Sequence, residues 1–279
     1  MRFWCSNDGR NWTWNWQPYW GAWVIVAALA FAFWKGGTFD KAQPRNRKIA
    51  VVLGLFLLLA GTDWPLASLG AGYMVTAQMI RQIIIVMIAC PLLLWGAPPS
   101  LGRWLVATER RKTIYRVITS PKVTLPVALG LLMAVTAPVV VEDLVTSQLG
   151  SFAMDVIWMT AGLLIWLPVQ APRPLRARLQ GPPLVVYLII VSVVPLPIAF
   201  FMTWSPFPIF EVYENSPRVF DWLSAEHDQE LGAAIFQVAG GLVIWAQIAV
   251  RFITMSKEGK DQPKFRGKLI PSASHGGPS

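Results

Sequence analysis

Seven apolar stretches with few charged residues occur along this 279-residue chain, each near the length that crosses a bilayer as a helix. Hydrophobic residues make up 54% of the chain and charged residues 14%, which favours a polytopic membrane protein over a soluble domain. The sequence therefore predicts an all-α membrane protein with seven transmembrane helices. We place these at 17–34, 49–66, 72–96, 123–141, 145–168, 183–204 and 231–250.

Lysine and arginine are distributed unevenly around these stretches. Twenty of the 24 lie in the loops at 35–48, 97–122 and 169–182 or in the tail from residue 251. Under the positive-inside rule these segments face the cytoplasm, which puts the N-terminus outside and the C-terminus inside. Because the basic residues flank apolar segments, we expect membrane lipid rather than nucleic acid as their partner.

Three parts follow from this pattern. Residues 1–18 are predicted to form an outer interfacial segment, because the tryptophans of NWTWNWQPYW (11–20) are typical of anchoring at lipid headgroups. Residues 19–250 form the membrane bundle, in which Pro195 and Pro197 predict a kink in the sixth helix. Residues 251–279 are basic and rich in proline, glycine and serine, which predicts a disordered cytoplasmic tail.

An arginine inside the third apolar stretch needs an explanation, because a charged side chain is costly there. Asp155 of the fifth stretch lies at almost the same distance from the predicted outer boundary as Arg81. Opposite charges at one depth predict an ion pair inside the bundle, whereas the alternative is that Arg81 extends along its own helix toward the interface. Polar residues expected to share this cluster are Gln78, Gln82, Thr136 and Gln148.

Catalytic and metal-binding motifs are missing from the sequence. We find no phosphate-binding loop, HExxH or GxSxG pattern, so we expect no enzymatic activity. Two histidines are too few for a haem or zinc centre built from several imidazoles. Met79, Met154 and His227 are the remaining candidates for a soft-metal site, although methionines in an apolar bundle more often serve packing.

The outer loop at 205–230 is strongly acidic, with six acidic residues against Arg218 alone and a net charge of −5. It also contains several aromatic residues, a mixture typical of a protein contact surface. A solvated acidic loop is the alternative. The candidate contact residues are Glu211, Glu214, Asp221, Trp222 and Asp228.

Three segments together resemble the CtaG family of cytochrome c oxidase assembly factors. They are GYMVTAQMIRQIIIVMIACPLLLWGAPP (72–99), AGLLIWLPVQAP (161–172) and DQELGAAIFQVAGGLVIW (228–245). The resemblance extends from about residue 50 to 250. It implies a seven-helix protein of the bacterial inner membrane that is needed to form active haem-copper oxidase and is commonly suspected of copper handling.

The resemblance breaks at the residues that would bind a metal. Where family members carry a pair of histidines on the third helix, the two histidine positions fall at Gln78 and Gln82. Family histidines of the fourth and fifth helices fall near Thr136, Phe152 and Val156, so no imidazole is left there either. Glutamine is a poor copper ligand and Arg81 would repel a cation, so we predict no cofactor, with copper disfavoured.

We therefore expect a haem-copper oxidase assembly factor that acts in the inner membrane by contact with an oxidase subunit. Two alternatives stay open: a permanent structural subunit of a larger respiratory or photosynthetic complex, and a copper-handling membrane protein. A small-molecule transporter is disfavoured because no inverted repeat is evident.

Overall fold

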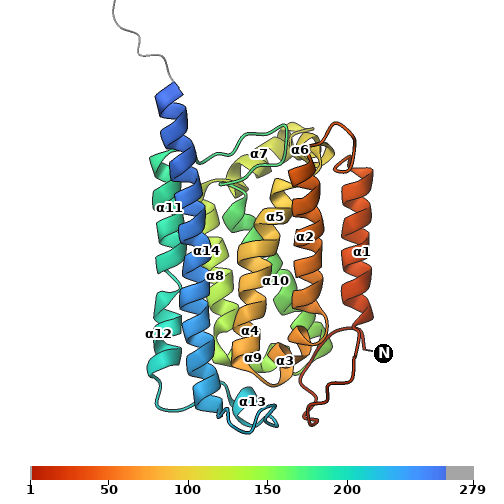
Figure 1. Cartoon of the computed structure of the whole chain (residues 1–279), viewed down its shortest axis with the longest axis vertical. Helices are drawn as coiled ribbons and strands as arrows, with labels where there is room; N and C mark the ends of the chain where they lie inside the picture. The colour runs from red at the N-terminus through yellow and green to blue at the C-terminus, as the bar shows by residue number, and fades with distance from the viewer. Residues whose placement is uncertain (1, 262–279) are drawn as a thin grey trace, which may run out of the picture.

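The computed structural model describes residues 2–261, with the surroundings of the side chains described for 2–253, and this part of the chain is helical throughout its regular structure (Figure 1). The helices are α1 Trp20–Lys35, α2 Arg45–Thr62, α3 Leu66–Gly72, α4 Val75–Gln82, the π-helix η1 Ile83–Ala89, α5 Cys90–Trp95, α6 Pro99–Leu105, α7 Glu109–Ile118, α8 Pro121–Thr136, α9 Pro138–Val145, α10 Gln148–Trp166, α11 Pro182–Val193, α12 Leu196–Trp204, α13 Glu211–Glu214 and α14 Ala225–Asp261.

Four helical segments of the described chain are long and apolar enough to cross a membrane, or up to six if each of two bent helix pairs is one span. The four are Val75–Trp95, Gln148–Trp166, Pro182–Trp204 and Ala225–Ile253. The bent pairs are α2 with α3 and α7 with α8, and α1 is a shorter apolar helix. Each of the seven apolar stretches predicted from the sequence coincides with at least one of these helices.

Proline explains the break in the sixth stretch. Helix α11 ends at Val193 and α12 begins at Leu196, so the helix is interrupted at the position where Pro195 and Pro197 predict a kink. The last stretch is longer than predicted, because α14 continues to Asp261. The expectation of disorder from residue 251 is therefore wrong up to Asp261, and the remainder of that predicted tail, 262–279, lies outside the described residues.

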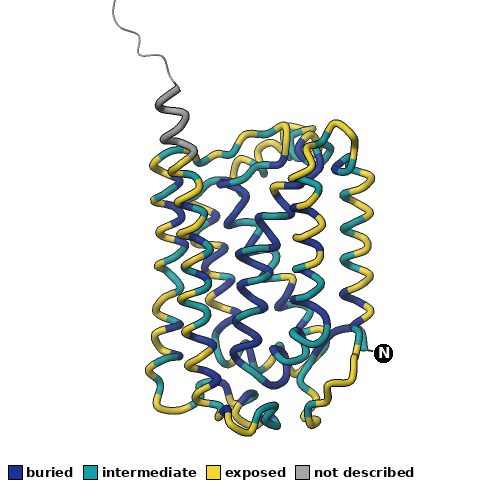
Figure 2. The backbone as a smooth tube through the Cα atoms, viewed as in Figure 1, coloured by how far each residue is buried: buried dark blue, intermediate teal, exposed yellow. Residues whose placement is uncertain are grey.

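The helix Val75–Trp95 forms the centre of the bundle. Within its most apolar window 78% of the residues are buried, against 11% for the corresponding window of Ala225–Ile253. Figure 2 shows the same contrast, with dark blue along α4 and yellow on the outward faces of α1 and α14. A side chain in α4 therefore has protein on every side, and a polar one must find its partners there.

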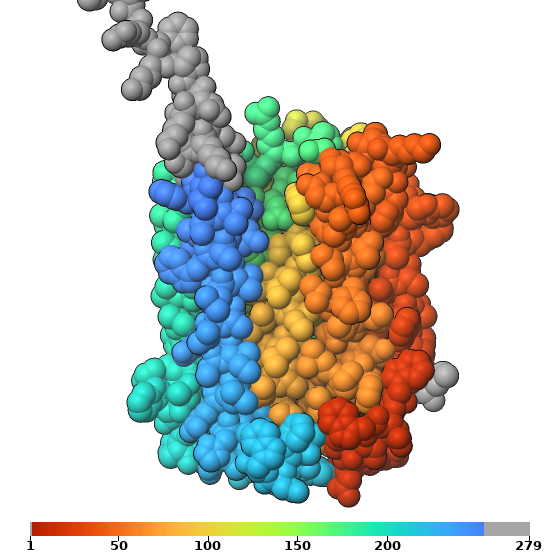
Figure 3. Space-filling view, viewed as in Figure 1, coloured from red at the N-terminus to blue at the C-terminus, as the bar shows by residue number. Residues whose placement is uncertain are grey.

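Loops gather at two opposite ends of the bundle. One end holds α6, α7 and the segment that joins α10 to α11 (Figure 1). The other end holds α3, α9, α13 and the N-terminal segment, residues 2–19. Figure 3 shows the N-terminal segment beside the loop at 205–224, and Asn7 Nδ2 donates a hydrogen bond to Ser216 Oγ there at 3.1 Å.

Candidate functional site

Arg81 and Asp155 form an ion pair inside the bundle. Arg81 Nη2 lies 2.8 Å from Asp155 Oδ1 and 2.7 Å from Oδ2. The two residues are 1% and 5% exposed. The pair connects α4 with α10, and a charge at this depth requires such a counter-charge. Arg81 does not extend along its own helix, which was the alternative.

The other two nitrogen atoms of the guanidinium also donate hydrogen bonds. Nε donates to the carbonyl oxygen of Gly61 at 2.8 Å and Nη1 donates to Gln78 Oε1 at 2.8 Å. Pro65 has no N–H, so Gly61 lacks the donor that a continuing α2 would supply, and Arg81 replaces it. The guanidinium also lies over the ring of Trp158, with its Cζ 5.5 Å from the centroid.

The N-terminal segment completes the cluster around Asp155. Trp4 Nε1 donates to Asp155 Oδ2 at 2.9 Å, and Trp4 is 3% exposed. Gln148 Oε1 accepts from the backbone N–H groups of Phe3 and Trp4 at 3.0 and 3.3 Å. The sequence predicted that Gln148 would contact the ion pair. In the structure Gln148 instead positions Trp4.

Cys5 lies between this segment and the ion pair. Its side chain is 0% exposed, and its Sγ is 3.9 Å from Arg81 Nη2. Burial raises the pKa of the thiol to about 12. Trp14 and Trp16 of the same segment are 60% and 64% exposed, so the outer tryptophans and the buried Trp4 have different surroundings.

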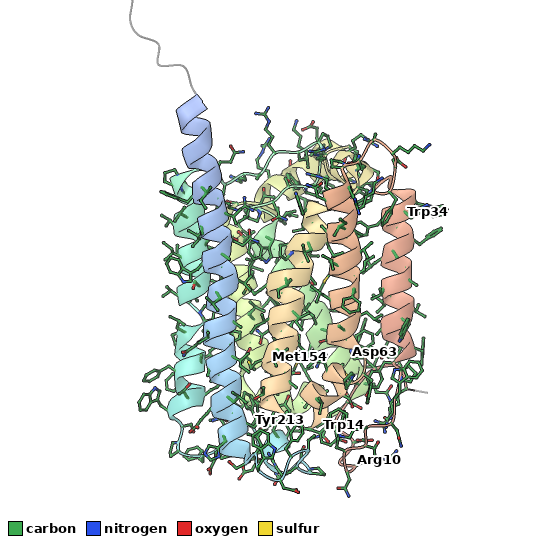
Figure 4. All side chains as sticks on the ribbon, viewed as in Figure 1. Arg10, Trp14, Trp34, Asp63, Met154 and Tyr213 are labelled. Carbon is green, nitrogen blue, oxygen red and sulfur yellow. The ribbon has the colours of Figure 1, made fainter. Side chains whose placement is uncertain are left out.

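We refer to Arg81, Asp155, Gln78, Trp4 and the Gly61 carbonyl as the polar centre. Figure 4 shows Met154, next to Asp155 in sequence, in the half of the bundle that also contains Asp63 and Tyr213, while Trp34 is near the opposite end. The polar centre is thus covered by the end of the molecule that carries the N-terminal segment.

Two predicted members of this cluster lie elsewhere. Gln82 follows Arg81 in α4, and a step of about 100° around the helix turns its side chain away. It lines a separate cavity, as does Thr136, whose Oγ1 donates to the Leu132 carbonyl of its own helix at 2.7 Å. The prediction that both belong with the ion pair is wrong.

The predicted soft-metal ligands do not come together. Met154 Sδ accepts a hydrogen bond from Gln78 Nε2 at 2.9 Å, Met79 lines the cavity beside Gln82, and His227 is exposed and bonded to Ser224. Within the described residues, no group of three or more histidine, cysteine, aspartate or glutamate side chains is arranged to hold a metal.

The residues of the polar centre do not fit a copper ion. Gln78 is the residue predicted at one family histidine position, and its amide already bonds to Arg81 and Met154. A cation placed there would lie beside the fixed charge of Arg81, at a distance where like charges repel strongly. This part of the protein is therefore closed by its own hydrogen bonds.

The acidic loop differs from the prediction at one residue. Glu211, Glu214, Asp221 and Trp222 are exposed, and Trp222 is 75% exposed. Asp228 is only 1% exposed, because its carboxylate accepts the backbone N–H groups of Val75 and Thr76 at 2.6 and 3.2 Å. It caps the first turn of α4 from α14, so the prediction that it contacts a partner is wrong.

Trp4 and Gly61 are the functional partners that the sequence did not reveal. A tryptophan in a polar N-terminal segment looks the same whether it lies at the interface or enters the bundle. The signal for Gly61 was present, since a proline four residues later removes the donor for its carbonyl oxygen. Nothing in the sequence says that the replacement comes from α4.

The fold and the polar centre define an all-α protein with several apolar helices of membrane-spanning length and a buried ion pair between two of them. Comparison with protein families matches residues 12–258 to the cytochrome c oxidase caa3 assembly factors, the Caa3_CtaG family. The match covers nearly the whole chain, so this protein belongs to that family. Trp4 and Cys5 precede the matched region. No curated protein and no solved structure matches the chain.

Proposed function

We propose that this protein assists cytochrome c oxidase assembly in a bacterial inner membrane, and that it acts by contact with an oxidase subunit rather than by carrying copper. Membership of the assembly-factor family supports the process. The observation that supports the mechanism is the polar centre, where Arg81 is paired with Asp155 and hydrogen-bonded to Gln78, the residue predicted at a family histidine position.

The proposed topology has seven spans, with α1, α2, α8 and the four long segments crossing the membrane and the N-terminus outside. The separation of loops supports it: the end with α6 and α7 carries most of the basic residues, and the opposite end carries the acidic loop. A periplasm-active reporter should work when fused at residue 215. It should fail at residue 175, and activity at residue 175 would reverse the orientation.

The contact surface in this proposal is the exposed part of the loop at 205–224. Glu211, Glu214 and Asp221 supply charge that steers an approaching partner, and the exposed rings of Phe207 and Trp222 supply area to bury. We expect the partner to be the outward-facing domain of an oxidase subunit or a cytochrome with a basic surface.

Deletion of the gene tests the function. The deletion strain should lose haem-copper oxidase activity while it still transcribes the oxidase genes, and plasmid-borne wild-type protein should restore the activity. Excess copper in the medium should not replace the protein, because the proposed role is contact. Full rescue by copper alone would contradict the mechanism, and unchanged oxidase activity in the deletion strain would contradict the function.

Replacement of Glu211, Glu214 and Asp221 by serine tests the contact surface. Wild-type protein should co-purify with its partner at low salt and lose it as salt rises, whereas the variant should bind weakly at every salt concentration. The matched control replaces Asp40 and Glu109, two exposed acids at the opposite end, by serine and should behave as the wild type. Equal co-purification of both variants would place the contact elsewhere.

A further inference from the structure

A cavity that is partly open to the surface lies on the side of α4 that faces away from the polar centre. Its walls come from α4 and η1, α8, the junction of α11 and α12, and α14, which lie next to one another in Figure 1. Most of the lining is apolar, and no charged side chain belongs to it.

Gln82 is the unusual residue in this lining. It is 4% exposed, and its Oε1 is buried without a hydrogen-bond partner among the described residues. Buried side-chain amides are almost always hydrogen-bonded, so an unpaired one in a cavity wall points to a missing partner. Gln82 Oε1 needs a donor, and the amide nitrogen can donate in return.

The cavity wall also contains a carbonyl group that proline has deprived of its donor. At three places in the bundle a side chain replaces the donor lost to proline: Arg81 donates to Gly61 before Pro65, Trp166 to Val86 before Pro91, and Gln229 to Met202 before Pro206. Val191 loses its donor to Pro195 in the same way, and no side chain of the described residues bonds to its carbonyl oxygen. Val191 and Pro195 both line the cavity.

We propose that this cavity binds a neutral, elongated apolar molecule that ends in a hydroxyl group. The apolar walls accept the chain, and the hydroxyl donates to Gln82 Oε1 while it accepts from the amide nitrogen. Gln82 is the eighth residue of the 21-residue segment Val75–Trp95, far from either end. A charged phospholipid headgroup is costly at that depth, whereas an uncharged prenyl alcohol or glyceride can reach it.

This inference rests on the proposed membrane location but not on the proposed role in oxidase assembly. The test uses full-length protein in phosphatidylcholine nanodiscs with a photoreactive analogue of farnesol. Crosslinking should map to α8, α12 or α14, and unlabelled farnesol should compete about tenfold better than farnesyl methyl ether, which cannot donate a hydrogen bond. Competition by dioleoylglycerol as strong as that by farnesol would assign the site to glycerides, and weaker competition would assign it to prenyl alcohols.

Two variants separate the hydroxyl contact from the cavity itself. Gln82→Leu should reduce the preference for farnesol over its methyl ether from about tenfold to about onefold. A side chain at Gly240 would enter open space in the cavity, since a Cβ there meets no heavy atom within 4 Å, so Gly240→Leu should abolish crosslinking. The control Gly130→Leu has equal room but lies outside the cavity, and it should label as the wild type.

Crosslinking that Gly240→Leu leaves unchanged would overturn the inference, and so would equal competition by farnesol and its methyl ether. Both outcomes are independent of oxidase activity in the deletion strain, so failure of the ligand site and failure of the proposed function are distinguishable.

Discussion

Arg81 and Gln82 are consecutive residues of α4, and their side chains enter opposite kinds of surroundings. Arg81 bonds to Asp155, Gln78 and the Gly61 carbonyl, which uses all three of its nitrogen atoms. Gln82 lines a cavity, and its Oε1 has no hydrogen-bond partner in the described part of the chain. On one side of the helix the polar side chain is hydrogen-bonded to the protein. On the other side a polar atom is available to bind another molecule.

The hydrogen bonds of a buried polar residue indicate its role. A residue whose bonds are all made within the protein is structural, and one with an unpaired atom can bind a ligand. In the polar centre each guanidinium nitrogen of Arg81 and both carboxylate oxygens of Asp155 are already hydrogen-bonded, so an added ligand would have to displace existing bonds. In the cavity a ligand can bond to the unpaired amide oxygen of Gln82 without breaking an existing hydrogen bond. Polar residues inside an apolar bundle are therefore better judged by their partners than by their charge.

The largest expected effect comes from removing one member of the ion pair. Arg81→Gln or Asp155→Asn should lower the free energy of unfolding by about 3–5 kcal/mol, because the remaining charge stays buried without a partner. The double variant Arg81→Met with Asp155→Leu should recover part of this loss. Unfolding by SDS, followed by circular dichroism, measures the change, and single variants as stable as the wild type would leave the two sides of α4 indistinguishable.

Trp4→Phe should lower the free energy of unfolding by a smaller amount. This substitution keeps an aromatic ring but removes the donor to Asp155 Oδ2. A hydrogen bond to a charged group contributes about 1.5–3 kcal/mol. The same change should make Cys5 react faster with iodoacetamide, because the native thiol is buried and its pKa is raised to about 12. Trp16→Phe, at a ring that is 64% exposed, should change neither stability nor labelling.

Loss of the cap on α4 should lower the stability of the protein moderately, because α4 carries both Arg81 and Gln82. Asp228→Ala removes the acceptor for the N–H groups of Val75 and Thr76 and should lower stability by about 0.5–2 kcal/mol. Hydrogen exchange at these two amides should accelerate. The exposed neighbour Glu226 offers the control, and Glu226→Ala should leave both measurements unchanged.

The smallest effect should come from Gln82→Leu, and it should have the opposite sign. Removing an unpaired buried amide in favour of an apolar side chain should leave stability unchanged or raise it by up to about 1 kcal/mol in protein free of ligand. Thermal unfolding in detergent measures this. A loss comparable with that of Arg81→Gln would mean that Gln82 has a protein partner, and the contrast between the two residues would fail.

Hydrophobic length and charge predict the positions of the helices, because every apolar stretch coincides with helical structure. Equal depth predicted the pairing of Arg81 with Asp155, since the rise per residue is constant along a helix. The burial of Trp4 and the capping by Asp228 could not be predicted, because both depend on how distant segments fold over the end of the bundle. Gln82 was assigned to the wrong cluster because helical spacing alone does not say which of two adjacent residues meets the partner helix.

The π-helix η1 gives the central segment an unusual geometry. Its backbone follows an i to i+5 pattern at its end, where Cys90 N–H donates to Ile85 O, so it takes in more residues per turn than an α-helix. The direction in which the side chains of α4 point, relative to those of α5, therefore depends on this wide turn. The same residues wound as an α-helix would rotate one end of the span against the other by about 100°, because the wide turn takes in one extra residue. Arg81 would then point away from Asp155 while the apolar composition of the span stayed the same. The alignment of Arg81 with Asp155 therefore depends on one wide turn of helix as well as on the ion pair itself.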